Sequence, residues 1–448
     1  MAQVHTSHGA RTGPGSGFAA VTAPPFRLDE AFARELDARD PLSQFRDRFE
    51  LPGGKTGQRR IYLLGNSLGP LPRGVRSVLA SELDAWASRG VESYFEPPAN
   101  WTSLDIRHRE TMATIVGAAP HEVGLMNGLT VNLHLLFASF YQPQAGRAKV
   151  LIERPCFPSD RYVVETQIRW HGSDPEEEII EVGEGDHGPV TAEAIERVLE
   201  ERGAEIALVF VGGVNFLTGE LLDMSRIAEA AHAAGCLVGL DLAHAVGNVP
   251  LSLHDWKIDF AAWCTYKYLN AGPGAVAGMF IHETHGTNRD RFRLGGWWGI
   301  DPDSRFRWQQ TEDFVHRQDA AGWQLSCPSV LSFAPIGPAL DLFRDAGMTR
   351  IRQKSVLLTG YLEWLLQQLA GRNLPMITPS NPDRRGAQLS LLANDAHGLR
   401  RTLAAEGIDV DVREPDVVRL APAPLFNTYH EVWRAAHLVA RHLNSERR

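Results

Sequence analysis

The chain has 448 residues, of which 44% are hydrophobic and 22% are charged; 45 basic and 54 acidic residues give a net charge of −9. This length suggests two or three domains, or one large domain with an appendage, and the composition is typical of a soluble globular protein. A mildly acidic chain lacks the basic surface of nucleic-acid-binding proteins, and no apolar run reaches the ~20 residues that cross a bilayer. The four cysteines, Cys156, Cys236, Cys264 and Cys327, are widely spaced, which disfavours structural zinc and disulfides and predicts reduced thiols in a cytoplasmic protein.

The N-terminal part predicts little regular structure before residue 25. Residues 1–22 are rich in small and polar residues and lack the apolar core of a signal peptide, so we expect a disordered tail. From about Pro25 to Pro120 the pattern is helical with loops, and Leu79–Trp86 forms an amphipathic stretch.

The middle of the chain alternates short apolar runs with helical stretches. A helix is predicted before the run at 237–241, because Asp223 can cap its start and Gly235 stands where a C′ glycine belongs. This alternation favours a mostly parallel, doubly wound sheet. The predicted strands are Lys149–Glu153, Ile206–Val211, Leu237–Asp241, Phe260–Cys264 and Val276–Ile281.

After about Pro335 the pattern predicts a smaller α+β domain. Ile351–Leu369 is a long amphipathic helix, and Tyr429–Leu443 is the last helix. Between them lie two strand candidates, Gln388–Leu392 and Val417–Leu420, separated by a further helix.

Two residues of the sheet region carry chemistry. Asp241 ends a predicted strand, and Lys267 follows the next one, before the turn-forming loop Asn270–Gly274. Since ligands of open α/β sheets bind beyond the carboxyl ends of the strands, both side chains should face one crevice. A lysine amine can form an imine with the aldehyde of pyridoxal 5'-phosphate (PLP), and a carboxylate beside the pyridine nitrogen keeps that nitrogen protonated. Either residue alone fits a solvated loop or a salt bridge, but the pair in this order predicts a PLP site.

A series of motifs extends this prediction over residues 61 to 440: Leu64–Gly69 (LGNSLG), Asn127–His134 (NGLTVNLH), Phe157–Asp160 (FPSD), Asp241–Asn248 (DLAHAVGN), Leu253–Trp256 (LHDW), Trp263–Gly274 (WCTYKYLNAGPG), Gly296–Gly299 (GWWG), Arg413–Asp416 (REPD) and Arg419–Pro422 (RLAP). In these motifs the chain resembles the kynureninase family. The resemblance implies a PLP-dependent homodimer of fold type I, with shared active sites and a mostly parallel seven-stranded sheet in the large domain. It also implies hydrolysis of the Cβ–Cγ bond of L-kynurenine, or a substituted kynurenine, to anthranilate and L-alanine, as in tryptophan catabolism.

On this basis we expect four segments. Residues 1–22 are the tail, residues 23–75 contribute to the small domain, residues 76–334 form the large PLP-binding domain, and residues 335–448 form the small C-terminal domain.

The resemblance assigns the cofactor site residue by residue. Lys267 resembles the Schiff-base lysine, Asp241 the partner of the pyridine nitrogen, and His244 a neighbour of the cofactor. Leu129 and Thr130 resemble the phosphate cradle, since Thr130 opens a helical stretch whose N-terminus offers free N–H groups; the simpler alternative makes Thr130 an N-cap.

Further residues complete the implied site. Phe157 resembles the residue stacked on the cofactor ring, and Asp160 belongs to the same segment. Tyr266 resembles a phosphate-contacting tyrosine, and we expect Tyr266 or Lys267 to transfer protons with pKa values lowered by burial and neighbouring cations. Trp297 resembles a residue that reaches the phosphate of the neighbouring subunit. Arg419 resembles the arginine that binds the substrate α-carboxylate, a task suited to a guanidinium fork.

The substrate side departs from the family pattern. Tyr94 and Ile300 stand where the family has histidines, and the family's Ser-Asn-Pro-Pro becomes Ser326–Ser329, which places Cys327 in a cofactor loop. Gly212 replaces a serine nearer the cofactor. With Arg419, the expected substrate contacts are therefore Asn66, Tyr94, Ile300 and Ser326. Family drift explains these changes as well as a changed acyl pocket does, and such a pocket would prefer a substituted kynurenine or another γ-oxo α-amino acid.

Two other functions stay open. A fold-type-I lyase of the cysteine desulfurase kind would need a mobile loop cysteine, for which Cys327 is the one candidate. A catalytically inactive PLP-binding protein is disfavoured because Lys267, Asp241 and Arg419 are all present. No metal site is expected.

Overall fold

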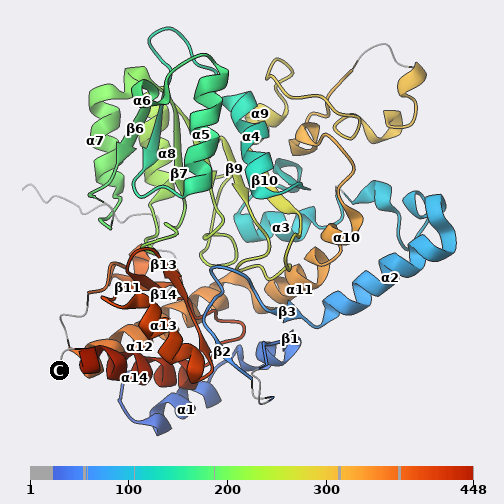
Figure 1. Cartoon of the computed structure of the whole chain (residues 1–448). Coiled ribbons are helices and arrows are strands. Elements are labelled where there is room, and N and C mark those ends of the chain that lie inside the picture. Colours follow the sequence, from blue (N-terminus) through green and yellow to red (C-terminus); the bar gives the residue numbers. More distant parts are fainter. Residues whose placement is uncertain are drawn as a thin grey trace, which may run out of the picture.

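The computed structural model describes residues 24–53, 57, 59–104, 106–185, 187–310, 314–371 and 375–446. The predicted tail at residues 1–22 lies outside these ranges. Figure 1 shows an upper body built on a large sheet and a lower body in which the C-terminal elements, drawn in red, lie beside the first helix, drawn in blue.

Seven strands form the large sheet in the order β4-β10-β9-β8-β7-β5-β6, which confirms the predicted α/β fold. All pairings from β6 to β9 are parallel, whereas β10 runs antiparallel to both of its neighbours. All five predicted strands are present, and two short edge strands, β4 and β6, were missed. The strands are β4 (Val123–Met126), β5 (Lys149–Glu153), β6 (Ile179–Val182), β7 (Ile206–Gly212), β8 (Leu237–Asp241), β9 (Phe260–Trp263) and β10 (Ala277–Ile281).

Helices cover both faces of this sheet because successive residues of each buried strand point to opposite sides. In β5, Val150 and Ile152 pack against α4 (Leu129–Phe140) and α5 (Pro158–Trp170). Leu151 joins the core on the other face, with α7 (Ala192–Arg202) and α8 (Met224–Ala233). All three side chains are fully buried, and each such burial contributes roughly 1.5–3 kcal/mol.

The predicted limits of α8 are confirmed. The Asp223 carboxylate accepts a hydrogen bond from the backbone N–H of Arg226 at 3.2 Å, which caps the helix start. Gly235 follows the helix with φ of +77°, a conformation that glycine adopts without strain.

The remaining helices surround the sheet or belong to the lower body. None of the described helices is both long and apolar enough to cross a membrane. They are α1 (Glu30–Ala38), α2 (Gly74–Arg89), α3 (Arg109–Val116), α6 (Pro175–Glu178), α9 (Glu283–Gly286), α10 (Val330–Phe333), α11 (Ile336–Ala346), α12 (Met348–Ala370), α13 (Ala396–Ala405) and α14 (Tyr429–Glu446).

The lower body contains a three-stranded antiparallel sheet in the order β11-β14-β13, with α12, α13 and α14 packed around it. Its strands are β11 (Leu389–Leu392), β13 (Asp411–Arg413) and β14 (Val417–Leu420). The two predicted strands and three predicted helices of this region are therefore present.

The N-terminal segment packs on this lower body. Strand β2 (Ile61–Tyr62) pairs in parallel with β12 (Ile408–Asp409), and Phe32 of α1 shares a core with α12 and α14. The short strands β1 (Phe49–Glu50) and β3 (Leu71–Pro72) pair with each other. The domain limits at residues 75 and 334 stay predictions.

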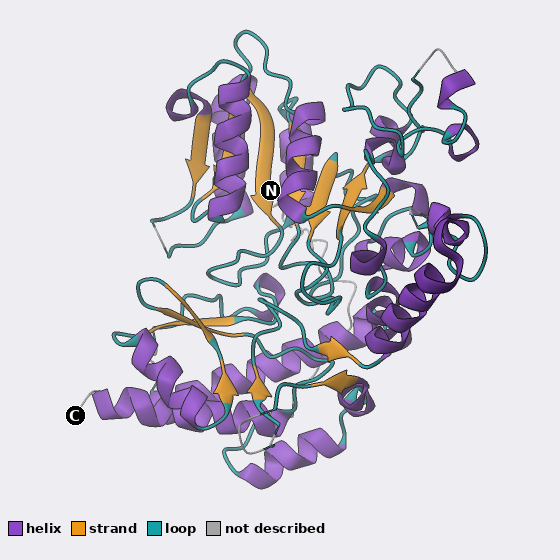
Figure 2. Ribbon diagram, turned by 45° about the vertical axis from the view of Figure 1, so that its right-hand side comes forward, coloured by secondary structure: helices purple, strands orange, loops and turns teal. Residues whose placement is uncertain are grey.

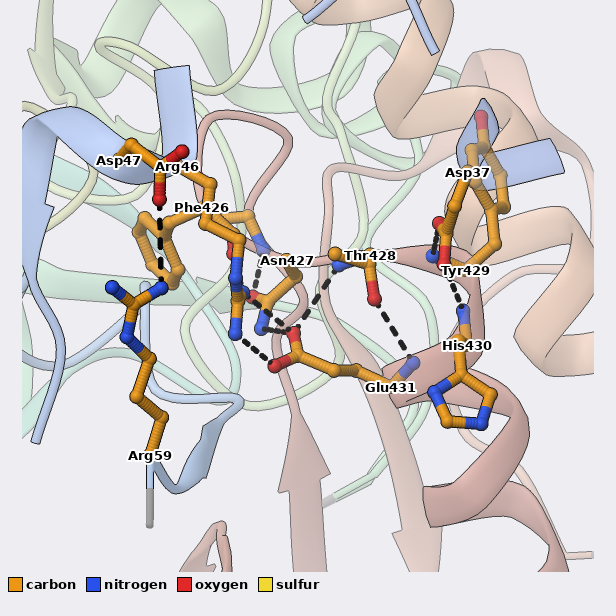
Figure 3. A network of polar contacts seen from close by, with 11 residues as sticks. Asp37, Arg46, Asp47, Arg59, Phe426, Asn427, Thr428, Tyr429, His430 and Glu431 are labelled. Atoms are coloured by element: carbon orange, nitrogen blue, oxygen red, sulfur yellow. Dashed lines mark hydrogen bonds and ion pairs between the residues drawn. The ribbon is translucent and has the colours of Figure 1, made fainter. Parts of the chain in front are cut away.

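Polar contacts join the N-terminal segment to the start of α14 (Figure 3). The carboxylate of Asp37, from α1, accepts hydrogen bonds from the backbone N–H groups of Tyr429 at 2.6 Å and His430 at 3.1 Å. Arg46 forms a salt bridge of 2.6 Å with Glu431. A side chain from α1 thus caps α14, a helix almost 400 residues further along the chain.

Candidate active site

A cavity of about 460 Å³ lies beyond the carboxyl ends of the parallel strands, beside the first turns of α4 and α5. In Figure 2 the parallel strands on the left of the sheet point toward the C-terminal body, and Arg413 from that body completes the cavity wall. This is the position predicted for ligands of an open α/β sheet. Nine residues predicted from the sequence line the cavity: Asn66, Leu129, Thr130, Phe157, Asp160, Asp241, His244, Tyr266 and Lys267.

The lysine and the aspartate approach the cavity from consecutive sheet strands. Asp241 is the last residue of β8, and its carboxylate accepts a hydrogen bond from the backbone N–H of Ala243 at 2.7 Å. Lys267 follows β9, and its Nζ lies 5.7 Å from the centroid of the Phe157 ring. The structure therefore places an amine, a buried carboxylate and an aromatic face on one cavity.

The turn that carries Lys267 is held by the first glycine-rich motif. The backbone N–H of Gly69 donates to the carbonyl of Tyr266 at 2.8 Å. A Cβ atom at Gly69 would lie 2.6 Å from the carbonyl oxygen of Lys267 and 2.2 Å from Oδ1 of Asn270. No side chain fits in this space, so the motif Leu64–Gly69 positions the lysine through backbone contact.

The N-terminus of α4 faces the same cavity. Helix α4 begins at Leu129, Gly128 is its N-cap, and no side chain caps it. The N-cap alternative for Thr130 is therefore wrong; its hydroxyl lies 3.0 Å from the hydroxyl of Ser159. Because the first turn of a helix carries unpaired N–H groups, this end of the cavity suits an anion.

Three buried carboxylates gather at the deep end of the cavity: Glu153, Asp160 and Asp241. Burial, followed by the neighbouring Asp241 carboxylate, raises the pKa of Asp160 well above its usual range. Burial likewise raises the pKa of Glu153 to about 7. Carboxylates that are buried close to one another favour a cation or a proton-bearing group beside them.

His244 borders this acidic end. Burial, followed by the charge of Lys267, lowers its pKa well below the usual range, so the imidazole is neutral. Its buried Nδ1 has no hydrogen-bond partner among the described residues. Oε2 of Glu153 and Oδ1 of Asn66, which also belong to cavity-lining residues, share that property. Buried polar atoms without partners indicate that the cavity is built for a polar ligand.

The predicted pKa of Tyr266 is wrong in direction. Burial, followed by the neighbouring Cys264, raises the pKa of the Tyr266 phenol. A desolvated phenolate is less stable than a desolvated phenol, and the nearby cations do not outweigh that cost. Tyr266 therefore carries its proton at neutral pH.

Arg419 is fully buried and does not line the cavity. Its Nε donates to Oδ1 of Asp411 at 2.7 Å, its Nη2 pairs with the other carboxylate oxygen, and its Nη1 donates to the carbonyl of Phe216 at 2.6 Å. Its predicted contact with a substrate carboxylate stays a prediction.

Two predicted residues meet outside the cavity, in a chain of aromatic rings. Tyr94 contacts Phe95, Phe95 contacts Phe306, and Phe306 contacts Trp297, with centroid separations of 5.1 to 6.4 Å. We call these four residues the aromatic chain. All four are at least partly accessible to solvent in the described protomer.

The other predicted substrate and cofactor contacts also lie outside the cavity of the protomer. Ile300 is buried and forms a β-bridge with His316. Ser326 is exposed, and Cys327 is partly buried with its thiol directed at the carbonyl of Pro328. All four cysteines are free thiols.

One cluster of metal-ligating residue types occurs among the described residues, away from the cavity. Ligand atoms of Glu122, His254 and His282 lie within 4.8 Å of one another. The Glu122 carboxylate already accepts hydrogen bonds from His254 and from the backbone N–H groups of Ala119 and Glu283. The arrangement is a hydrogen-bond network centred on Glu122, and His254 of the LHDW motif takes part in it.

Sequence reasoning missed Glu153 and Arg413 as cavity residues. Glu153 ends the apolar strand β5 as Asp241 ends β8, so the same signal could have found it. Arg413 lies in the REPD motif, but nothing local shows that its strand faces the large sheet.

Comparisons with known proteins match this geometry. Residues 351–439 match the family model for the kynureninase C-terminal domain. The chain is 44% identical to a kynureninase of Koribacter versatilis over 95% of this chain and 100% of that protein. It is 46% identical to a kynureninase of Myxococcus xanthus over 93% and 98% of the two chains.

Solved structures share the fold at low identity. The cysteine desulfurase CsdA of Escherichia coli aligns with a TM-score of 0.71 and 18% identity over 90% of this chain and 98% of that one. A mutant of C-DES with glycine covalently linked to its PLP cofactor aligns with a TM-score of 0.70 and 17% identity over 85% and 96%. These likenesses show the PLP fold-type-I architecture.

Proposed function

The chain belongs to the kynureninase family, and from this membership we propose that it hydrolyses the Cβ–Cγ bond of L-kynurenine to give anthranilate and L-alanine. The observation that carries the proposal is the convergence of Lys267 and Asp241 on one cavity in a chain that aligns with the full length of a kynureninase. A cysteine-desulfurase-like activity is less well supported, because Cys327 does not line that cavity.

We propose PLP as the cofactor. The cavity offers an amine at Lys267, a carboxylate pair at Asp160 and Asp241, and an uncapped helix N-terminus at Leu129. These groups suit the aldehyde, the ring nitrogen and the phosphate of PLP, respectively. When bound, PLP supplies an electron-accepting ring that stabilises negative charge at the substrate Cα.

The side chains divide the proton transfers among themselves. Lys267 takes the Cα proton once its amine is free, and Asp241 keeps the proton of the ring nitrogen in place. Tyr266, which holds its proton at neutral pH, is the acid next to Lys267. Water adds to the γ-carbonyl of the substrate, and the Cβ–Cγ bond then breaks with its electron pair left on Cβ. Anthranilate leaves, Cβ takes a proton from the neighbouring acid, and L-alanine is released.

A Lys267→Ala variant tests the proposal. We expect the purified protein to bind PLP with the absorbance of a lysine-bound cofactor, and the variant to lose that band together with anthranilate formation. Anthranilate fluorescence measures turnover directly. A variant that releases anthranilate as fast as the wild type would refute the assigned role of Lys267.

We further propose a homodimer in which the aromatic chain completes the cavity of the partner subunit. This arrangement would explain why Trp297 and Tyr94 gather away from the cavity of their own protomer. Co-expression of Lys267→Ala with Trp297→Ala chains tests it. One site of each mixed dimer would then be intact, so the purified mixed dimer should recover toward half of the wild-type activity; no recovery above Trp297→Ala alone would contradict shared sites.

The identity of the acyl group depends on the departures at Tyr94, Ile300 and Cys327. The relatives at 44–46% identity are kynureninases, which favours kynurenine itself. Steady-state kinetics on kynurenine, 3-hydroxykynurenine and small γ-oxo amino acids decide between drift and a changed pocket. Efficient turnover of plain kynurenine would end the changed-pocket alternative.

A further inference from the structure

We propose that Arg413 contacts the α-carboxylate of the substrate from the wall of the cavity, as a binding residue that acts beside Arg419. The inference rests on the proposed function for the choice of an α-amino acid as ligand. Arg413 is the residue of the REPD motif that lines the cavity.

The placement of Arg413 follows from the small sheet. Asp411 and Arg413 stand two residues apart on β13 and so point to the same face. Arg419 lies directly opposite Asp411 on the neighbouring strand β14, where cross-strand side chains touch. One face of this sheet therefore carries two guanidinium groups around one carboxylate.

Arg419 and Arg413 differ in how many polar partners they have and in how exposed they are. Asp411 binds Arg419 through both carboxylate oxygens, and Arg419 is fully buried. Arg413 makes only a longer ion pair with Asp411, at 3.6 Å, its side chain is 39% exposed, and it lines the cavity. Its buried Nε has no hydrogen-bond partner among the described residues. The exposed part of the Arg413 side chain thus lies at the cavity, and among the described residues Asp411 alone pairs with its charge.

The charged residues of the cavity wall show which of them can attract the substrate carboxylate. Among the described lining residues, Lys267 and Arg413 are the basic ones, and the neutral His244 stands near both. The amine of an amino-acid substrate must reach the position of the Lys267 amine, so its carboxylate, on the same carbon, must lie close by. The carboxyl groups of Glu153, Asp160 and Asp241 offer no positive charge to a carboxylate, whereas Arg413 attracts one. Burial and the adjacent Arg419 lower the pKa of Arg413, and the negative charge of a bound carboxylate would oppose that lowering.

Spectral titration of the PLP-loaded enzyme tests the inference without turnover. L-alanine is the probe, and ethylamine, which lacks only the carboxylate, is its matched ligand. We expect Arg413→Gln to weaken L-alanine binding about 10- to 100-fold, the range for one lost charge-assisted hydrogen bond, and to leave ethylamine binding unchanged. In kynurenine kinetics the loss should appear mainly in KM. Arg401→Gln, an exposed arginine of α13 with 69% side-chain exposure, is the control and should match the wild type.

Two results would overturn the inference: unchanged L-alanine affinity in Arg413→Gln, or equal weakening of L-alanine and ethylamine. If Arg413→Gln does not fold, Arg413→Lys decides, since it keeps the charge but loses the planar fork; a 3-fold or smaller effect on L-alanine together with wild-type KM would count against Arg413. A wild-type enzyme that binds L-alanine through Arg413 yet never cleaves kynurenine would refute the proposed function and leave this inference standing.

Discussion

Replacing Glu153 by glutamine is expected to remove a pH dependence from the stability of the PLP-free protein. Glu153 is 5% exposed at the end of β5, and its Oε1 accepts a hydrogen bond from the backbone N–H of Gly212 at 3.1 Å. Its other carboxylate oxygen has no partner among the described residues. Burial raises the pKa of this carboxyl group from 4.5 to about 7. Glutamine keeps the shape and an acceptor for Gly212 but cannot ionise.

The sign and size follow from proton linkage. Because the pKa is higher in the folded state, the folded protein binds more protons than the unfolded chain between about pH 4.5 and pH 7. The free energy of unfolding therefore falls as the pH rises through that window, and it stops falling above pH 7. A rise in pKa from 4.5 to about 7 corresponds to about 3 kcal/mol at 1.36 kcal/mol for each pH unit. Asp160, whose pKa is also raised, changes stability in the same direction.

Urea unfolding at pH 5, 6, 7 and 8, followed by tryptophan fluorescence, measures the effect. The stability of Glu153→Gln relative to the wild type should increase by about 2.5 kcal/mol from pH 5 to pH 8, because the rest of the change lies below pH 5. Glu229→Gln, an exposed residue of α8, controls for the loss of one carboxylate. If the free energies of unfolding of the wild type and Glu153→Gln differ by the same amount at every pH in this range, Glu153 is not a buried carboxyl group that holds a proton.

Three further predictions concern contacts outside the acidic end. Gly69→Ala should displace the Lys267 turn and lower both PLP affinity and turnover about 10- to 100-fold. Gly53→Ala, where a Cβ atom meets no atom within 4 Å, is the control and should change neither. Equal PLP affinity and turnover in the two variants would contradict the close contact at Gly69. Asp37→Ala should lower the free energy of unfolding by about 1–2 kcal/mol in urea, since it removes the acceptor for the N–H groups of Tyr429 and His430 at the start of α14. A neutral result would show that solvent replaces this acceptor. Lys354→Met should lower the free energy of unfolding by about 3–5 kcal/mol, measured in urea or by heating, because it leaves the buried carboxylate of Asp40 without the charge that contacts it at 2.7 Å. A double variant that also replaces Asp40 by leucine should recover much of this stability.

Much of the molecule follows from short-range sequence patterns. The apolar runs at 149–153, 206–211 and 237–241 became β5, β7 and β8, and Asp223 and Gly235 mark the ends of α8 as expected. Asp241 and Lys267 could be placed on one cavity because strand ends of a parallel sheet meet at one edge. Periodicity and capping are local properties, and the chain carries them in its residue order.

Other features depended on contacts between distant segments. The antiparallel direction of β10 and the edge strands β4 and β6 are decided by neighbours across the sheet. Asp411 forms its salt bridge with Arg419, and Arg413 lines the cavity. This arrangement depends on the pairing of β13 with β14. The raised pKa of Tyr266 likewise reflects the desolvation of a folded interior. Side-chain identity alone specifies neither burial nor partners, since both arise when segments far apart in the chain pack together.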